Sequence, residues 1–190
     1  MQFYIKKTGA VLEMDDRNRN KKWHALYTKS RNEKKVYQQL IGKGITCYLP
    51  LKKEWKQWSD RRKLVESPLI NSYLFVKVNS KEYFEVLNTY GAVRYIFFEG
   101  RAAEIPEKQI QVLRQVVESN QLQFQLINTP LQKGDQVEIT KGPLSGYCGE
   151  VFQEPSNRKI LIRIDYIGNS LVVEIDKTWD VVRKSKVTAG

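Results

Sequence analysis

The feature that most constrains the fold is an apolar run near the middle of the chain, Tyr-Leu-Phe-Val-Lys-Val at residues 73–78, which is entered through Pro68. Short runs that are rich in aromatic and β-branched residues are typical of strands inside a sheet. Strand side chains alternate between two faces, which gives an aliphatic face of Leu74, Val76 and Val78 and an aromatic face of Tyr73 and Phe75. We therefore interpret residues 68–78 as a central strand. The cover of its aromatic face is either the protein's own core or a partner.

Periodic patterns on either side of this strand predict the rest of an N-terminal domain. The expected elements are strands at residues 22–28, 45–51 and 93–98, and helices after Ser30, at residues 80–87 and after Pro106. Ser30 and Glu33 have the spacing of a capping box, and Ser80 is the expected N-cap of the second helix. This order predicts an antiparallel α+β sandwich with helices on one face of the sheet. The face of Tyr73 and Phe75 would then be partly bare.

A segment of mixed aromatic and basic character precedes the central strand. Residues 54–66, EWKQWSDRRKLVE, place Trp55 and Trp58 among four basic residues. One interpretation is a hairpin arm whose tryptophans stack on bases while its cations hold phosphates. The other is a solvated surface loop. The sequence leaves both open.

The chain changes character after residue 118. Residues 119–132 are polar and end near a proline, which is typical of a linker, although alternating apolar residues at 122, 124 and 126 leave room for a short strand. Residues 133–183 contain five short period-two segments separated by turn residues. This pattern predicts a small five-stranded β-barrel. Residues 1–21 are expected to form a flexible arm, and residues 184–190 a tail.

The charge distribution points to a polyanionic partner. The net charge is +11 with a pI near 9.6, and nearly all of the surplus lies before Lys133. The sequence has no apolar run long enough to span a bilayer and no signal peptide pattern, so we expect a cytoplasmic protein without membrane contact. Cys47 and Cys148 are too few and too far apart for a disulfide framework or a cysteine metal site, and we expect both to be buried.

Two stretches carry a specific resemblance to a known family. Residues 134–151, GDQVEITKGPLSGYCGEV, resemble a KOW motif, which occurs in ribosomal proteins and in NusG-type elongation factors. KWHALYTKSRNEKKVYQQL and SPLINSYLFVKV resemble the opening and the central strand of a NusG N-terminal (NGN) domain. The resemblance covers residues 22–183, with an NGN domain at 22–118 and a KOW domain of the SH3-like barrel type at 133–183. Asn71-Ser72 replaces the Pro-Gly of housekeeping members, which favours a specialised paralogue like RfaH or the UpxY antiterminators.

The resemblance implies three binding surfaces. In the family, central-strand aromatics dock on the clamp helices of RNA polymerase, which implies Ile70, Tyr73, Phe75 and Ile96. Specialised members read an exposed non-template DNA strand with the first helix, which implies a set of basic and amide side chains: Lys29, Arg31, Lys34, Lys35, Gln38 and Gln39. The KOW domain contacts ribosomal protein S10 or Rho, which implies Tyr166, Ile167 and Gly168. For Ile167, a purely structural role in the hairpin is an equal alternative.

These implications support one leading hypothesis and two alternatives. The leading hypothesis is a monomeric, non-catalytic transcription factor that suppresses pausing and termination, at surface-polysaccharide operons by resemblance to UpxY. The first alternative is a ribosome-associated or RNA-binding KOW protein that acts in translation. The second is an enzyme, which the sequence disfavours because His24 is the only histidine and no catalytic or phosphate-binding motif is present. We expect no cofactor and no metal.

Overall fold

The computed structural model describes residues 20–119, 122, 124–127, 136–153, 158–164, 169–174 and 180–183. Their strands form two sheets of several strands and two isolated hairpins. The expected arm at residues 1–21 lies outside the described residues except for its last two, and so does the expected tail at 184–190.

The first sheet is antiparallel and is built around strands β1 (Lys22–Thr28) and β5 (Tyr73–Val78). Its order is β2-β5-β1-β6, where β2 is Thr46–Tyr48 and β6 is Ala92–Tyr95, and β9 (Glu104–Ile105) pairs with the free part of β1. The predicted central strand is therefore interior, as expected, but it begins at Tyr73. Ser72 has a φ of 63°, and this left-handed turn separates β5 from the strand before it.

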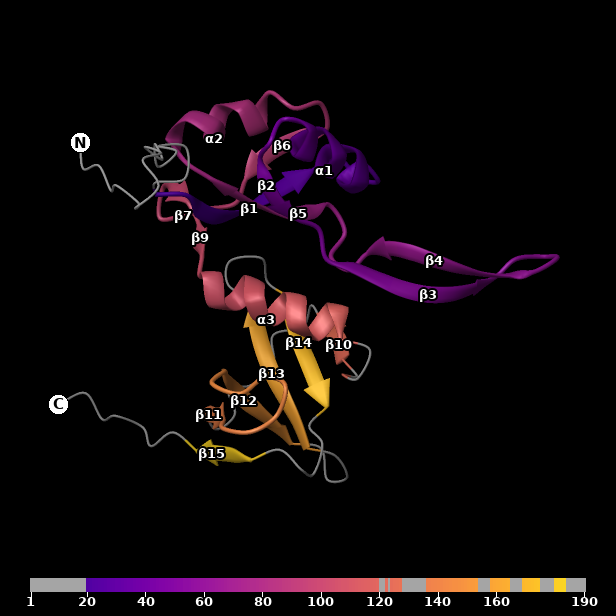
Figure 1. The fold of residues 1–190 in the computed structure, drawn as a ribbon, viewed down its shortest axis with the longest axis vertical. Helices are drawn as coiled ribbons and strands as arrows, with labels where there is room; N and C mark the ends of the chain where they lie inside the picture. The colour runs from indigo at the N-terminus through magenta and orange to yellow at the C-terminus, as the bar shows by residue number, and fades with distance from the viewer. Residues whose placement is uncertain are drawn as a thin grey trace, which may run out of the picture.

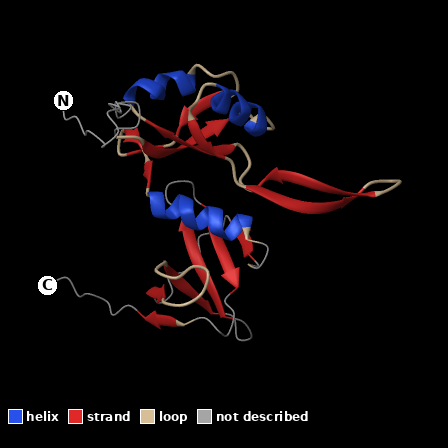
Figure 2. Cartoon of the chain, in the orientation of Figure 1, coloured by secondary structure: helices blue, strands red, loops and turns tan. Residues whose placement is uncertain are grey.

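Helices cover both faces of this sheet. Helices α1 (Glu33–Gly42) and α2 (Ser80–Leu87) lie on the aliphatic face of β5, and α3 (Glu107–Glu118) lies on the aromatic face (Figure 1). The prediction of helices on one face only is therefore wrong. Figure 2 shows the same arrangement, with helices in blue on either side of the red strands.

Helix α3 is held at its N-terminus by polar contacts to the sheet. The Glu107 carboxylate accepts hydrogen bonds from Lys77 at 2.7 Å and from the indole of Trp23 at 2.9 Å. The Lys77 ammonium group, helped by the Trp23 donor, lowers the pKa of Glu107. Further along, the Arg114 guanidinium lies 4.8 Å from the ring centre of Tyr48 in β2. These contacts fix which side of α3 faces the first sheet.

Both predicted helix caps are wrong, for different reasons. Helix α1 begins at Glu33 rather than after Ser30, because Arg31 has a φ of 60° and turns the chain first. The buried Glu33 carboxylate accepts the Ser72 N–H at 2.7 Å instead of bonding back to the helix start. Helix α2 is capped by Asn79, one residue before the predicted Ser80.

Strands β3 (Leu51–Gln57) and β4 (Arg62–Pro68) pair only with each other and form a long hairpin that extends away from the first sheet (Figure 1). The segment is therefore a hairpin and not a loop, while the expected stacking of its tryptophans on bases stays a prediction. A second, very short hairpin is made by β7 (Phe97–Phe98) and β8 (Arg101–Ala102).

The second sheet contains the five predicted strands and one more from the expected linker. Its order is β10-β14-β13-β12-β11-β15. The bounds are Phe124–Ile127 for β10, Gln136–Ile139 for β11, Cys148–Gln153 for β12, Arg158–Ile164 for β13, Asn169–Glu174 for β14 and Val181–Arg183 for β15. In this sheet β10 pairs only with β14, and β15 pairs only with β11. Strands β10 and β15 are therefore the two edge strands, and the described residues do not form a closed barrel.

Helix α3 joins the two sheets through one apolar cluster. Ala25 and Phe75 of the first sheet, Ile110 and Leu113 of α3, and residues such as Val137 of the second sheet are all buried in it. Lys108 of α3 also donates to the Gly146 carbonyl at 3.3 Å. Figure 1 shows α3 between the two sheets.

The two cysteines differ in exposure. Cys47 is buried as expected, and burial raises the pKa of its thiol to about 12, whereas Cys148 is exposed, which contradicts the prediction. In the described part of the chain, every helix is too short or too polar to cross a bilayer.

Candidate functional site

A row of aromatic and basic side chains crosses the first sheet on the face of α3. Tyr73 of β5 pairs in register with Tyr27 of β1, and Tyr27 pairs with Arg94 of β6. The Tyr27 and Tyr73 rings meet edge to face with centroids 5.3 Å apart, and the Arg94 guanidinium lies 5.8 Å from the Tyr27 ring centre. Both tyrosines are half-buried. We call Tyr27, Tyr73 and Arg94, together with the neighbouring half-buried Ile96, the aromatic row.

The structure brings together the four residues implied for polymerase binding but exposes them unequally. Ile70 and Phe75 are 3% and 0% exposed and belong to the cluster beneath α3, whereas Tyr73 and Ile96 pack against the edge of that cluster. Phe75 stacks on Tyr48 with centroids 6.4 Å apart. Only Tyr73 and Ile96 offer surface to a partner in this arrangement, and Ile70 and Phe75 form their support.

Sequence reasoning missed Tyr27 and Arg94 as members of this row. Tyr27 lies on the same face as Trp23 and Ala25, so the alternation in β1 contained part of the signal. The sequence does not contain the strand register, which places Tyr27 directly opposite Tyr73. Register depends on pairing between distant segments and cannot be read from either strand alone.

The basic side chains implied for nucleic-acid binding lie on and before helix α1. Lys29, Arg31, Lys34, Lys35, Gln38 and Gln39 are all exposed. Lys29 Nζ lies 5.0 Å from the ring centre of Tyr90, and the Gln39 amide donates to the Tyr90 carbonyl at 3.2 Å. Tyr90 is 71% exposed and belongs to this surface, although no sequence pattern singles it out.

The close packing of the Tyr90 turn on α1 depends on a glycine. Gly91 has a φ of 96°, and a Cβ atom there would lie 2.9 Å from Cγ2 of Val36 in α1. Its carbonyl also accepts the Lys29 N–H at 2.9 Å. Glycine is therefore required by both the backbone angle and the contact distance. The result is a fixed juxtaposition of Tyr90 with the basic side chains of α1.

A groove connects the start of α1 to the base of the β3–β4 hairpin. It has a volume of about 530 Å³ and is lined by Ser30, Arg31, Glu33, Lys34, Glu66, Ser67, Pro68 and Asn71. Across it, Lys34 Nζ donates to the Glu66 carbonyl at 2.8 Å. Lys34 therefore links the basic surface of α1 to the base of the hairpin.

Comparison with known proteins shows the family to which the chain belongs. Residues 21–114 match the family model described as transcription termination factor NusG. The transcription termination/antitermination proteins NusG of Staphylococcus aureus strains Mu50 and N315 are each 24% identical over 180 residues, which cover 86% of this chain and 96% of the relative. The chain belongs to the NusG family. A solved structure concerning domain interaction in Thermotoga maritima NusG has a TM-score of 0.50 at 17% identity, covering 87% of this chain and 98% of that one, and supports the fold.

NusG-family transcription termination/antitermination factors are not enzymes. The one histidine of this NusG-family chain has a structural environment that fits this. His24 is 9% exposed, its Nδ1 lies 3.0 Å from the Ala103 carbonyl, and the rings of Tyr83 and Tyr95 meet it edge-on. Burial lowers its pKa. Among the described residues, no cluster of His, Cys, Asp and Glu could hold a metal ion.

The third implied surface of the NusG-family chain stays a prediction. Tyr166, Ile167 and Gly168 lie outside the described residues. Strands β13 and β14, on either side of them in the sequence, pair antiparallel, with Ile164 opposite Asn169.

Proposed function

We propose that this NusG-family protein is a specialised elongation and antitermination factor that binds the clamp helices of RNA polymerase and suppresses pausing and termination at selected operons, by resemblance surface-polysaccharide operons. The observation that carries the proposal is the aromatic row. Tyr73 and Ile96 keep exposed surface at the edge of the α3 cluster, with a basic neighbour, Arg94, at the same edge. Aromatic residues with arginine are the composition of protein-binding centres.

In this proposal, a helix of the polymerase clamp lies against the aromatic row. Tyr73 and Ile96 supply the apolar anchor, and the buried Phe75 and Ile70 hold them in place from beneath. Helix recognition by an apolar depression needs few anchor residues if their positions are rigid. Register pairing of Tyr73 with Tyr27 and the packing of α3 supply this rigidity.

The second contact in the proposal is to an exposed non-template DNA strand. Lys29, Arg31, Lys34 and Lys35 would attract its phosphates, and Gln38 or Gln39 would reach base edges. Through Tyr166, Ile167 and Gly168, the C-terminal sheet would recruit ribosomal protein S10 or Rho. A tether between the two parts raises the local concentration of that partner near the transcript.

The test is a pull-down of stalled elongation complexes, with and without an exposed non-template strand, by the full chain and by Tyr73→Ala. We expect Tyr73→Ala to lose polymerase binding because truncation removes the central anchor. The matched control is Tyr37→Ala, since Tyr37 is a half-buried tyrosine that packs on the opposite face of the sheet. Circular dichroism checks that both variants fold.

A separate variant tests the DNA contact. Lys35→Gln with Gln39→Ala is expected to bind polymerase normally but to lose most of the gain from the exposed strand. Retained polymerase binding by folded Tyr73→Ala contradicts the proposal. Capture of RNA in the absence of polymerase, with strong salt dependence, favours the ribosome-associated alternative instead.

A further inference from the structure

The β3–β4 hairpin carries large apolar side chains that the fold does not use. Trp55 is 64% exposed, Trp58 is 56% exposed and Leu64 is 44% exposed. The hairpin pairs with no other strand, so these side chains have no sheet to cover. Exposed apolar groups that gather in one place on a protein mark interaction sites.

Register assigns the hairpin side chains to two faces. Trp55 is opposite Leu64, with the pairs Lys53–Glu66 and Gln57–Arg62 on either side of it. Trp55 therefore lies in an apolar centre with cations before and after it on the same face. Trp58 is at the tip, where its backbone N–H donates to the Arg61 carbonyl at 2.8 Å and closes the turn.

The cations at the base of the hairpin are paired, and Arg61 at the tip lies 3.9 Å from Asp60, whereas Lys56, Arg62 and Lys63 form no ion pair with a described residue. Near the base, Lys52 forms an ion pair with Glu54 at 2.6 Å, and Lys53 with Glu66 at 3.6 Å. Farther out, Lys56 is directly opposite Lys63, and neither forms an ion pair with a described residue. Like charges opposite each other destabilise a hairpin. A hairpin selected for its own stability would repeat the Lys53–Glu66 pattern here.

Unpaired cations and exposed tryptophans therefore occupy the same half of the hairpin. We propose that this half is an arm that binds single-stranded DNA, with bases stacked on Trp55 and Trp58. Phosphates would be drawn to Arg62, on the same face as Trp55, and to Lys56 and Lys63, which the register places on the opposite face, as the strand passes around the edge of the hairpin. Stacking on a side chain needs bases that are free of their own partners, which favours a single strand over a duplex. A phosphate near Lys56 and Lys63 would relieve their mutual repulsion.

The choice of DNA rests on the function proposed above, because the groove with Arg31 and Lys34 leads from the DNA-binding face of α1 to the base of this hairpin. The binding of a single strand by the hairpin does not rest on it. One strand could lie along α1, cross the groove and continue onto the arm. This would lengthen the DNA contact beyond what α1 alone provides.

The proposal is tested by fluorescence anisotropy of a labelled oligothymidylate of about 15 nucleotides, within the range of single-strand site sizes, titrated with the full chain. Trp55→Ala and Trp58→Ala should each weaken binding by about tenfold, in the range measured for base stacking on aromatic residues. Trp55→Phe should keep most of the affinity because it keeps a ring. Lys56→Gln should lower the slope of log affinity against log salt by about one.

Controls separate this site from polymerase docking. Lys81→Gln removes an exposed lysine of α2 and should leave the affinity unchanged, and Tyr73→Ala should bind the oligonucleotide like the wild type. The Trp55 and Trp58 variants should still bind polymerase when no strand is exposed. If Tyr73→Ala fails to lose polymerase while the tryptophan variants lose the oligonucleotide, only the proposed function fails.

Four results would overturn the proposal. The first is wild-type oligonucleotide affinity in the folded Trp55→Ala/Trp58→Ala double variant. The second is equally tight binding of a duplex of the same sequence, which would mean charge attraction alone. The third is tighter binding of oligouridylate, which would assign the arm to RNA. The fourth is tryptophan-dependent capture by phosphatidylserine vesicles without oligonucleotide binding, which would assign it to a membrane surface.

Discussion

His24 is a titratable group inside the first sheet, and its surroundings determine its charge. The Ala103 carbonyl can only accept a hydrogen bond, so Nδ1 at 3.0 Å carries the proton of the neutral ring. Burial, with a smaller contribution from Lys22 of the same strand, opposes protonation of the ring and outweighs the Ala103 carbonyl and Glu104, which favour it, so the pKa is lowered. The folded protein therefore binds the second ring proton, which makes the imidazole cationic, less tightly than the unfolded chain does.

This imbalance predicts acid sensitivity. The unfolded chain binds more protons once the pH falls toward the ordinary histidine pKa of about 6.5, so the contribution of the neutral ring to stability is complete above that value and is lost as the pH falls toward the lowered pKa. Urea unfolding at about pH 7.5 and pH 5.5 should show a loss of unfolding free energy that is smaller in His24→Gln, whose amide can still donate to Ala103. An equal loss in both proteins would contradict this assignment.

At the residue scale, the sequence predicted which way side chains face better than how exposed they are. Alternation placed Leu74 and Tyr73 on opposite faces correctly, because it follows from strand geometry alone. It could not predict that Phe75 is fully buried, because its cover comes from α3, more than thirty positions later in the chain.

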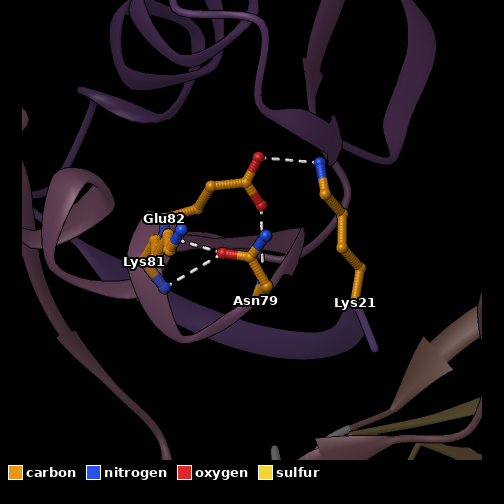
Figure 3. Close-up of polar contacts among 4 residues, drawn as sticks. All are labelled: Lys21, Asn79, Lys81 and Glu82. Carbon is orange, nitrogen blue, oxygen red and sulfur yellow. Dashed lines mark hydrogen bonds and ion pairs between the residues drawn. The ribbon is translucent and has the colours of Figure 1, made fainter. Parts of the chain in front are cut away.

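At the element scale, the N-terminus of α2 is the best-defined cap among the described helices. Asn79 Oδ1 accepts the N–H groups of Lys81 and Glu82 at 3.0 Å each, and the Glu82 carboxylate accepts the Asn79 N–H at 3.2 Å (Figure 3). Glu82 also forms an ion pair with Lys21 at 2.7 Å, and the two side chains are 15% and 8% exposed. This pair joins the start of α2 to the residue before β1.

Asn79→Ala should therefore destabilise the protein by about 1 kcal/mol, the usual cost of losing an N-cap side chain. Ser80→Ala is the matched control, because Ser80 is the cap that the sequence predicted and the structure does not use. We expect it to stay within about 0.5 kcal/mol of the wild type, as for most surface substitutions. Chemical denaturation of the three proteins measures both effects. A larger loss from Ser80→Ala would restore the sequence prediction.

The two capping patterns show that the sequence predicts the presence of a helix better than the residue at which the helix begins. Ser30 and Glu33 have the same spacing as Asn79 and Glu82, yet only the second pair forms a capping box. Glu33 instead bonds the backbone of Ser72, in a turn that is distant in sequence. Local signals predicted that helices occur in these places, and tertiary contacts decided where each begins. The same limit applies to the groove at Glu66, which needs α1 and β4 together.

At the scale of the whole molecule, the division into two sheets was predictable and the position of α3 between them was not. Its pattern of Ile110, Leu113, Val116 and Val117 suggested one apolar face. At 100° per residue, Val112 lies nearly opposite Ile110 on the helix, and it is only 4% exposed. Because Val112 is only about 40° from Val116 on the helix, it widens the apolar face of α3 toward the Lys108 contact with Gly146.

This geometry predicts that the second sheet can be detached while the first stays folded. Val112→Asp places a charge in the apolar contact, and burying it without a partner would cost several kcal/mol, whereas opening the contact lets water reach it. Gln111→Asp makes a similar change at an exposed neighbour and serves as the control. We expect small-angle scattering to show a larger radius of gyration for Val112→Asp only, with near-wild-type circular dichroism. An unchanged radius in a folded Val112→Asp protein would mean that this side of α3 does not hold the two sheets together.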